Sequence, residues 1–226
     1  CGTGQIPNFL ALAGPRRTVI GVDGCRASLT LADGFRSKVG TRNLRFLRGD
    51  LFALPVQESR FDVVISRGVV HHTPEPYRAT AEVARRVRPD GVLVVAFYES
   101  MGRAFHRMRQ QMTRAFKNPP KALDPVLRRN DLDPEKKRTW VADQYEHPLE
   151  HCLPFPRVTR EVEALGFRWI RSLPPAVSGD GMFDATDKPG AVQMSLRRVG
   201  WMMAGLRDQD AGMACLVARR VGSASS

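Results

Sequence analysis

The 226-residue sequence predicts an α/β fold, a three-layer αβα sandwich built around a mostly parallel sheet. Two observations support this prediction. Short runs of β-branched and other apolar residues alternate with amphipathic stretches over about the first hundred residues, and apolar residues make up 42% of the chain, enough for a substantial core. Strands that are apolar throughout and separated by helices are typical of a parallel sheet covered on both faces.

The first part of the chain predicts four strands and two helices. In order, these are a strand over 18–23, a helix over 27–40, strands over 44–50 and 61–66, a helix over 77–88 and a strand over 92–98. Asp23 and Asp50 end the first two strands. The second helix carries Ala79, Val83 and Val87 on one face, and the Pro-Asp-Gly sequence after it turns the chain into the next strand.

The pattern becomes mainly helical and basic after residue 98. The predicted elements are helices within 101–140 that break at the prolines near 118–120 and 133–134, a helix over 157–165, a strand over 167–172, a loop over 174–190, a helix over 192–206 and a closing antiparallel strand over 212–221. We therefore expect three segments, which are a ligand-binding core (1–98), a helical insertion (99–156) and a C-terminal part that completes the sheet (157–226).

The composition argues against several classes of protein. The longest apolar runs are far shorter than the roughly 20 residues that span a bilayer, and no basic segment precedes an apolar one as in a secretory leader. The four scattered cysteines have no metal-ligand spacing. We therefore expect reduced thiols, no metal site and a cytoplasmic protein.

The formal net charge of +12 raises the alternative of a nucleic-acid partner. The densest basic region, residues 103–138, is interrupted by acidic residues and lacks the interleaved aromatic residues of a single-strand-binding surface. A solvated face, or attraction to an acidic small molecule, is the favoured interpretation, and the nucleic-acid alternative stays open.

The opening sequence CGTGQ, residues 1–5, predicts a glycine-rich turn that leads into an apolar helix. Glycines let a ligand approach the backbone, and the start of a helix offers free N–H groups. In an open parallel sheet, ligands bind outside the carboxyl ends of the strands. Asp23 is placed there to accept both ribose hydroxyls of an adenosine, and Asp50 to meet the adenine amino group. The alternative is a tight turn and a helix cap.

Binding of a dinucleotide is the rival interpretation of this turn. A dinucleotide fingerprint needs a third glycine three residues after the second. That position is Pro7, whereas Gly2 and Gly4 fit the last two glycines of a G-x-G-x-G turn. This spacing favours a mononucleoside with a methionine tail over a pyrophosphate.

Five segments resemble, in order, the motifs of class I, Rossmann-like S-adenosylmethionine-dependent methyltransferases. They are CGTGQ from residue 1, VIGVDGCRASL from 19, LRFLRGDLFALPV from 44, FDVVISRGVVHHTPEP from 61 and RVRPDGVLVV from 86. The resemblance implies S-adenosylmethionine as the cofactor, with the glycines near its methionine part, Asp23 on the ribose and Asp50 at the adenine. The cofactor-binding residues that it implies are Cys1, Gly2, Thr3, Gly4, Gln5, Asp23, Gly24, Asp50, Leu51, Ser66 and Arg67.

The sequence departs from the family pattern at two places. The apolar first strand and leading glycine that normally precede Cys1 are absent, so we expect this chain to be part of a longer reading frame. Because that strand is central in the family fold, its absence predicts two half-sheets with unpaired edges. Gly24 stands where family members often carry a larger side chain against the adenine.

The resemblance names no catalytic base, because methyl transfer chiefly requires the acceptor to be held in line. Position therefore selects the candidates His71, His72, Tyr98 and His147. The two adjacent histidines follow a strand near the methyl end of the expected pocket, and they take a proton from the acceptor or hydrogen-bond the adjoining loop. Tyr98 orients the acceptor or simply ends its strand. His147, in the DQYEHP segment at 143–148, belongs to a substrate-side cap or to a turn.

These features predict methyl transfer to an O, N or C nucleophile of a small molecule, with the insertion at 99–156 as a lid over the substrate. The first alternative is an RNA methyltransferase, which the charge motivates. The Asn/Asp-Pro-Pro-Tyr-type motif expected for a flipped base is replaced by SRGV at 66–69. The second alternative is a non-catalytic domain that binds the cofactor.

Overall fold

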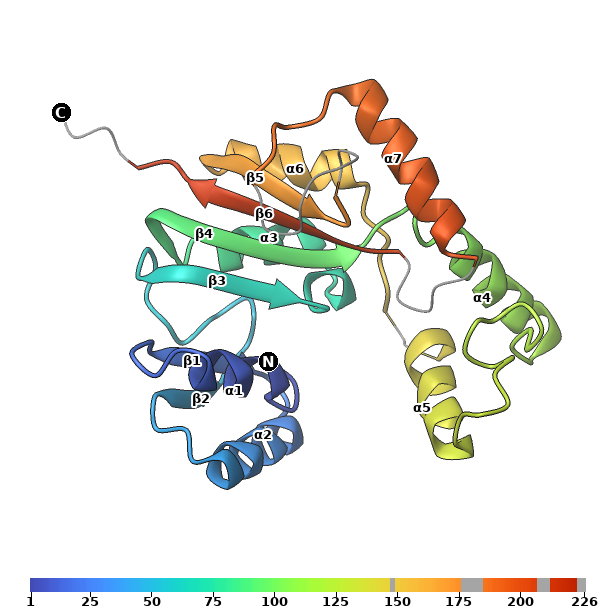
Figure 1. The fold of residues 1–226 in the computed structure, drawn as a ribbon, viewed down its shortest axis with the longest axis horizontal. Coiled ribbons are helices and arrows are strands. Elements are labelled where there is room, and N and C mark those ends of the chain that lie inside the picture. Colours follow the sequence, from blue (N-terminus) through green and yellow to red (C-terminus); the bar gives the residue numbers. More distant parts are fainter. Residues whose placement is uncertain (147–148, 176–184, 207–211, 223–226) are drawn as a thin grey trace. The chain divides into compact units, whose positions relative to one another are not determined.

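The computed structural model describes residues 1–146, 149–175, 185–206 and 212–222. The chain divides into two compact units, Cys1–Glu58 and Ser59–Ser226, whose elements are labelled in Figure 1. The predicted core, residues 1–98, extends over both units, and the predicted boundaries at 98 and 156 stay predictions. In the part of the chain that the structure describes, no helix is both long enough and apolar enough to cross a bilayer.

The first unit is a pair of parallel strands with two helices packed against them (Figure 1). Its elements are α1 (Gln5–Leu12), β1 (Val19–Asp23), α2 (Arg26–Val39) and β2 (Leu44–Arg48). Val19 lies opposite Leu44 in this pair, and Asp23 lies opposite Arg48. The predicted strands and helices of this part of the chain are confirmed.

Helix α1 buries a different face from the one that its apolar residues indicate. Asn8 is fully buried, whereas Phe9 and Leu12 are exposed. The Asn8 side-chain amide donates hydrogen bonds to the carbonyl oxygens of Gly4, at 2.9 Å, and Ala32, at 3.4 Å. Asn8 shares the buried face with Pro7 and Ala11, and because a buried amide must be hydrogen-bonded, its contacts help to fix the orientation of the helix.

The second unit contains a four-stranded sheet with the strand order β3-β4-β6-β5. Its elements are β3 (Phe61–Arg67), the 3-10 turn η1 (Val70–His72), α3 (Pro76–Ala84), β4 (Val87–Tyr98), α4 (Ala104–Phe116), α5 (Pro134–Tyr145), α6 (Phe155–Ala164), β5 (Phe167–Leu173), α7 (Ala191–Ala204) and β6 (Met213–Arg220). β3 and β4 are parallel, and β6 runs antiparallel to both β4 and β5. The predicted antiparallel closing strand is confirmed, and the strands of the described residues form two sheets, as expected.

Residues 88–91 form a bulge within β4, where the sequence predicts a turn between a helix and a strand. Phe61 of β3 already pairs with Val87, and regular pairing resumes at Val92. Asp90 adopts a left-handed conformation with φ of 61°. The turn chemistry of Pro-Asp-Gly is therefore present, but it lies inside a strand pair because Val87, two residues before the proline, also pairs with β3.

The core of the second unit lies between the sheet and helices α3 and α6, which pack against the same sheet (Figure 1). Its fully buried side chains on β4 are Val87, Leu93, Val95 and Phe97. The Phe155 ring, at the start of α6, lies with its centroid 5.6 Å from that of Phe97 and 5.4 Å from that of Trp201 on α7. An aromatic cluster thus joins the sheet to two helices.

A buried carboxylate anchors three elements at the end of β4. Glu99 accepts hydrogen bonds from the backbone N–H groups of Met101 and Gly102, each at 2.8 Å, and of Phe155, at 3.3 Å. The guanidinium of Arg198, on α7, donates to the same carboxylate at 2.8 Å. Glu99 is fully buried, so a ligand cannot reach it. The neighbouring Tyr98 is half-buried, and its polar side chain is accessible at this end of the strand.

Replacing Glu99 with alanine is expected to lower the free energy of unfolding by about 3–5 kcal/mol, because it leaves the mostly buried Arg198 without its partner. Urea unfolding followed by circular dichroism measures this change. Glu161→Ala is the matched control, since Glu161 pairs with Arg157 at the surface and such pairs contribute less than about 1 kcal/mol. Equal effects of the two substitutions would contradict the anchoring role of Glu99.

Candidate functional site

The glycine turn at the start of the chain has the backbone that the sequence predicts. Gly2 and Gly4 have φ values of 56° and 80°, in the left-handed region that favours glycine. A Cβ atom at Gly2 would meet nothing within 4 Å, whereas one at Gly4 would lie 2.5 Å from Ala32 Cβ. Gly2 therefore leaves open space beside the turn, and Gly4 allows α2 to pack closely. Thr3 and Gln5 are exposed on this turn.

Asp23 ties the turn to the end of β1. Its Oδ2 atom accepts a hydrogen bond from Gly2 N at 2.7 Å and lies 2.9 Å from Cys1 N, and its Oδ1 atom accepts one from Cys25 N at 2.9 Å. Burial acts to raise the pKa of this carboxyl, but the hydrogen bonds outweigh burial and lower the pKa below its ordinary value. Asp23 is therefore charged at neutral pH. A carboxylate has about four acceptor positions, so these contacts leave one on Oδ1 for a ligand.

Asp50 lies near Asp23 because of the register of the two strands. Asp23 is paired with Arg48, so Asp50 follows two residues beyond that pair on the neighbouring strand. Its Oδ1 atom accepts a hydrogen bond from Phe52 N at 2.9 Å, and the residue is exposed. Leu51 is half-buried beside it, and a Cβ at Gly24 would meet only Gly49 O, at 3.6 Å.

The residues of the first unit fit a nucleoside. An exposed glycine turn precedes the start of α1, and two carboxylates follow the ends of adjacent parallel strands. This arrangement supplies N–H donors on one side and acceptors for hydroxyl and amino groups on the other. The first unit thereby brings together nine of the predicted cofactor-binding positions, residues 1–5, 23, 24, 50 and 51.

Ser66 and Arg67, which complete the predicted cofactor set, lie in the second unit at the end of β3. Ser66 Oγ is buried and has no hydrogen-bond partner among the described residues. Arg67 is exposed. The assignment of both residues to the cofactor stays a prediction.

His71, His72 and Tyr98 come together at the carboxyl end of β3 and β4. The ring centroids of His71 and Tyr98 are 4.2 Å apart, and those of His72 and Tyr98 are 5.8 Å apart. His71 is fully buried, whereas His72 and Tyr98 are half-buried. Of the two histidines, only His72 is therefore placed to meet a ligand.

The hydrogen bond of His72 determines which of its nitrogens can accept a proton. Nδ1 lies 2.9 Å from the carbonyl oxygen of Leu149. Because a carbonyl oxygen only accepts hydrogen bonds, Nδ1 carries the proton, and Nε2 is the basic atom of the neutral ring. His72 thus hydrogen-bonds the adjoining loop, as one of the two sequence interpretations proposes, and its role as a proton acceptor stays a prediction.

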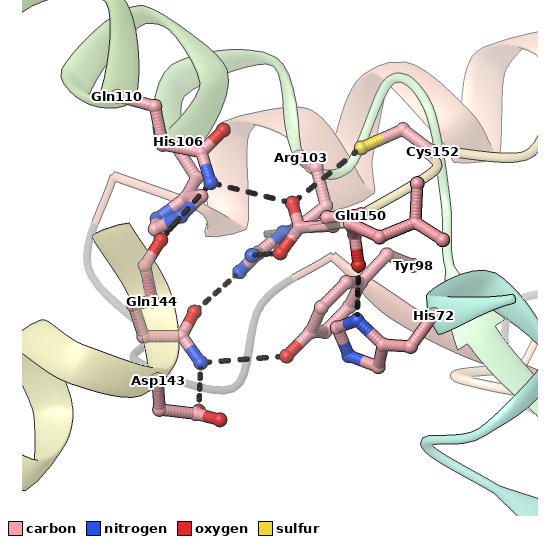
Figure 2. Close-up of polar contacts among 10 residues, drawn as sticks. His72, Tyr98, Arg103, His106, Gln110, Asp143, Gln144, Glu150 and Cys152 are labelled. Carbon is pink, nitrogen blue, oxygen red and sulfur yellow. Dashed lines mark hydrogen bonds and ion pairs between the residues drawn. The ribbon is translucent and has the colours of Figure 1, made fainter. Parts of the chain in front are cut away.

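The phenol of Tyr98 lies against a buried arginine that sequence reasoning missed (Figure 2). Burial raises the pKa of Tyr98 although the Arg103 charge acts to lower it, so the phenol stays protonated at neutral pH. The Arg103 guanidinium carbon is 3.7 Å from the centroid of the Tyr98 ring, and Gln144 Nε2 donates to the phenol oxygen at 3.4 Å. The Tyr98 hydroxyl is therefore held as a proton donor.

Arg103 connects the site to the helical insertion. It donates to Gln144 Oε1 at 3.0 Å and to Glu150 Oε2 at 2.9 Å, and both charged side chains are more than nine-tenths buried. Glu150 lies between Gln110 on one side and Tyr98 on the other (Figure 2). The sequence gives one signal for this network, because polar residues concentrate after Tyr98 and around the DQYEHP segment. It does not indicate which of these residues pair.

The DQYEHP segment divides among different roles. Gln144 belongs to the Arg103 network, and the Tyr145 hydroxyl donates to the buried carboxylate of Asp124. His147, a predicted catalytic residue, lies outside the residues that the structure describes. Within the described ranges, no group of three or more His, Cys, Asp or Glu side chains is arranged to hold a metal ion.

The comparisons with known proteins match the first part of the chain to one family. Residues 1–95 match a model described as a methyltransferase domain. Trans-aconitate 2-methyltransferase of Deinococcus radiodurans is 33% identical over 108 residues, 48% of this chain and 39% of that protein. Demethylmenaquinone methyltransferase of Lactococcus lactis is 33% identical over 95 residues, 42% of this chain and 38% of that protein. The matches span less than half the length of the curated relatives.

A solved structure extends the likeness to nearly the whole chain. It is an S-adenosylmethionine-dependent methyltransferase from Methanosarcina mazei, with a TM-score of 0.59 and 16% identity, covering 99% of this chain and 90% of that chain. Likeness at this level of identity shows the fold, and it confirms the predicted Rossmann-like α/β architecture.

The two glycines of the turn are expected to respond differently to substitution. Gly4→Ala combines a left-handed backbone with a Cβ overlap and should lower the free energy of unfolding by about 3 kcal/mol. Gly2→Ala, its matched control, has the strained backbone but open space, and should cost about 1 kcal/mol. Urea unfolding measures the free energy of unfolding of both variants. An equal decrease in the two would contradict the prediction that close packing against Ala32 excludes a side chain at Gly4.

Proposed function

Because residues 1–95 form a class I, Rossmann-like methyltransferase domain, we propose that this protein transfers the methyl group of S-adenosylmethionine to an O, N or C nucleophile of a small molecule. The names of two relatives support a small acceptor, since trans-aconitate and demethylmenaquinone are both small molecules. The observation that carries the proposal is the charged Asp23 carboxylate, which is held beside the glycine turn with one acceptor position open.

The proposed cofactor contacts use the first unit as it stands. S-adenosylmethionine, when bound, supplies an electrophilic methyl group on a sulfonium. Asp23 Oδ1 accepts a ribose hydroxyl, and Asp50 accepts from the adenine amino group. Leu51 packs near the adenine, beside Asp50, and the open space beside Gly2 takes the methionine part. The turn residues Cys1, Thr3, Gly4 and Gln5, together with Gly24, Ser66 and Arg67, complete the proposed set.

The proposed acceptor contacts use the second unit. His72 Nε2 takes a proton from an acceptor hydroxyl or protonated amine, and the Tyr98 hydroxyl donates a hydrogen bond that orients the acceptor. His71 is fully buried, so its proposed role is to position the ring of His72. His147 and the insertion at 99–156 remain candidates for the wall of the acceptor site.

Binding of S-adenosylhomocysteine tests the cofactor site without a known acceptor. Asp23→Asn is expected to weaken binding, measured by calorimetric titration, by at least about tenfold, because it removes a charged hydrogen-bond acceptor. Asp33→Asn is the matched control, since Asp33 lies in the same unit and pairs with Arg36 on the surface of α2. Unchanged affinity in Asp23→Asn, with both variants folded, would overturn the ribose assignment.

Alkylation of Cys25 gives a second readout of the same site. The thiol is exposed, and hydrogen bonds from Ser28 lower its pKa below the ordinary value, whereas burial raises the pKa of Cys152 and Cys215 to about 11. Cys25 should therefore react with iodoacetamide at pH 8 before Cys152 and Cys215 do. Bound S-adenosylhomocysteine should slow its reaction, because the Cys25 N–H binds the carboxylate that is proposed to hold the ribose.

His72→Gln tests the proposed base once an acceptor is found by screening for S-adenosylhomocysteine release. The substitution is expected to lower kcat by about 100-fold, a typical contribution of general base catalysis. The affinity for S-adenosylhomocysteine should stay unchanged. A full rate in His72→Gln would remove the residue from the mechanism, and cofactor binding with no turnover of any acceptor would favour a non-catalytic domain.

A further inference from the structure

A polar pocket of about 310 Å³ opens between α4 and residues 150–152. The residues that line it are Arg107, Gln110, Gln111, Arg114, Glu150, His151 and Cys152. The four residues from α4 have the spacing i, i+3, i+4 and i+7, so they share one face of the helix. One helix face and one extended segment therefore build the two walls of the pocket.

The charges in this pocket are mostly positive. Arg107 and Arg114 have no ion-pair partner among the described residues, and both are exposed. The acidic residue of the lining, Glu150, is already neutralised by the buried guanidinium of Arg103, at 2.9 Å. Gln111 adds an exposed amide. The pocket thus presents two uncompensated arginines and hydrogen-bond donors to solvent.

A second observation points to a ligand at the same place. His151 Nε2 is buried and has no hydrogen-bond partner in the part of the chain that the structure describes, and His151 is one of the lining residues. Cys152 lines the pocket but is a poor nucleophile, since burial raises the pKa of its thiol to about 11. The pocket is therefore suited to non-covalent binding.

The spacing of the two arginines limits the kind of ligand. Arg107 and Arg114 are seven residues apart, which corresponds to about 10 Å along an α-helix. A single small anion can therefore contact both guanidinium groups only if the two side chains bend toward each other. We propose that this pocket binds a small molecule that carries two or more carboxylate or phosphate groups. One group pairs with Arg107 and the other with Arg114, in bidentate geometry where the anion allows it.

The pocket is distinct from the proposed acceptor site. In Figure 2, Arg103 and Glu150 lie between Gln110, which lines the pocket, and the pair Tyr98 and His72. The segment that contains His151 also donates its backbone N–H to His71 O at 2.8 Å, so it forms a wall between the two sites. The inference does not depend on methyl transfer.

Calorimetric titration of the whole protein at low ionic strength with citrate, pyrophosphate and inorganic phosphate tests this proposal. Citrate or pyrophosphate is expected to bind at least about tenfold more tightly than inorganic phosphate, because each engages both arginines. Preference for citrate identifies a polycarboxylate, and preference for pyrophosphate identifies a phosphate ester. Arg107→Gln and Arg114→Gln should each weaken the preferred ligand by about tenfold.

Arg160→Gln is the matched control, because Arg160 is exposed on α6 and does not line the pocket. It should leave the affinity unchanged, and all three variants should keep the affinity for S-adenosylhomocysteine, which separates this proposal from the cofactor site. Equal binding of inorganic phosphate and the larger anions, or equal losses in Arg160→Gln, would overturn the proposal. Binding of a single-stranded RNA that depends on Arg107, without binding of either small anion, would overturn it as well.

Discussion

The polar site of the second unit depends on one buried ion pair, that between Arg103 and Glu150. A buried guanidinium costs several kcal/mol of desolvation unless its donors are used. Arg103 uses its two terminal nitrogens on Glu150 and the Gln144 side chain and lies over the face of the Tyr98 ring, whereas its Nε is buried without a hydrogen-bond partner among the described residues. These contacts come from β4, from the last turn of α5 and from the segment that follows α5, so the pair holds the insertion against the sheet.

In the first unit, a partly buried charge is stabilised by backbone N–H groups instead of by a second charged side chain. Asp23 is only partly buried, and N–H groups from the glycine turn and from the start of α2 keep it charged. Such an arrangement is assembled before any ligand arrives, which lowers the cost of ordering the turn on binding. The same carboxylate therefore serves the local fold and remains available to a hydroxyl group.

Both units place their candidate ligand-binding and catalytic groups where parallel strands end. Asp23 and Asp50 follow β1 and β2, and the pair His72 and Tyr98 follows β3 and β4. Asp23 is held by the N–H of Cys25, His72 by the carbonyl oxygen of Leu149, and the Tyr98 ring by the guanidinium of Arg103. Rigid support of this kind is what a reaction needs when its main requirement is the alignment of two reactants.

Local periodicity and φ preferences depend on neighbouring residues, so the strands, the glycine turn and the acids at or just after the ends of β1 and β2 could be predicted from the sequence. It also indicated the closing antiparallel strand and brought His71, His72 and Tyr98 forward as candidates. Only the tertiary structure decided which histidine is accessible, that Glu99 is an anchor, and that Arg103 and Glu150 pair across 47 residues. Burial and long-range pairing depend on how distant segments pack, and no local pattern carries that information.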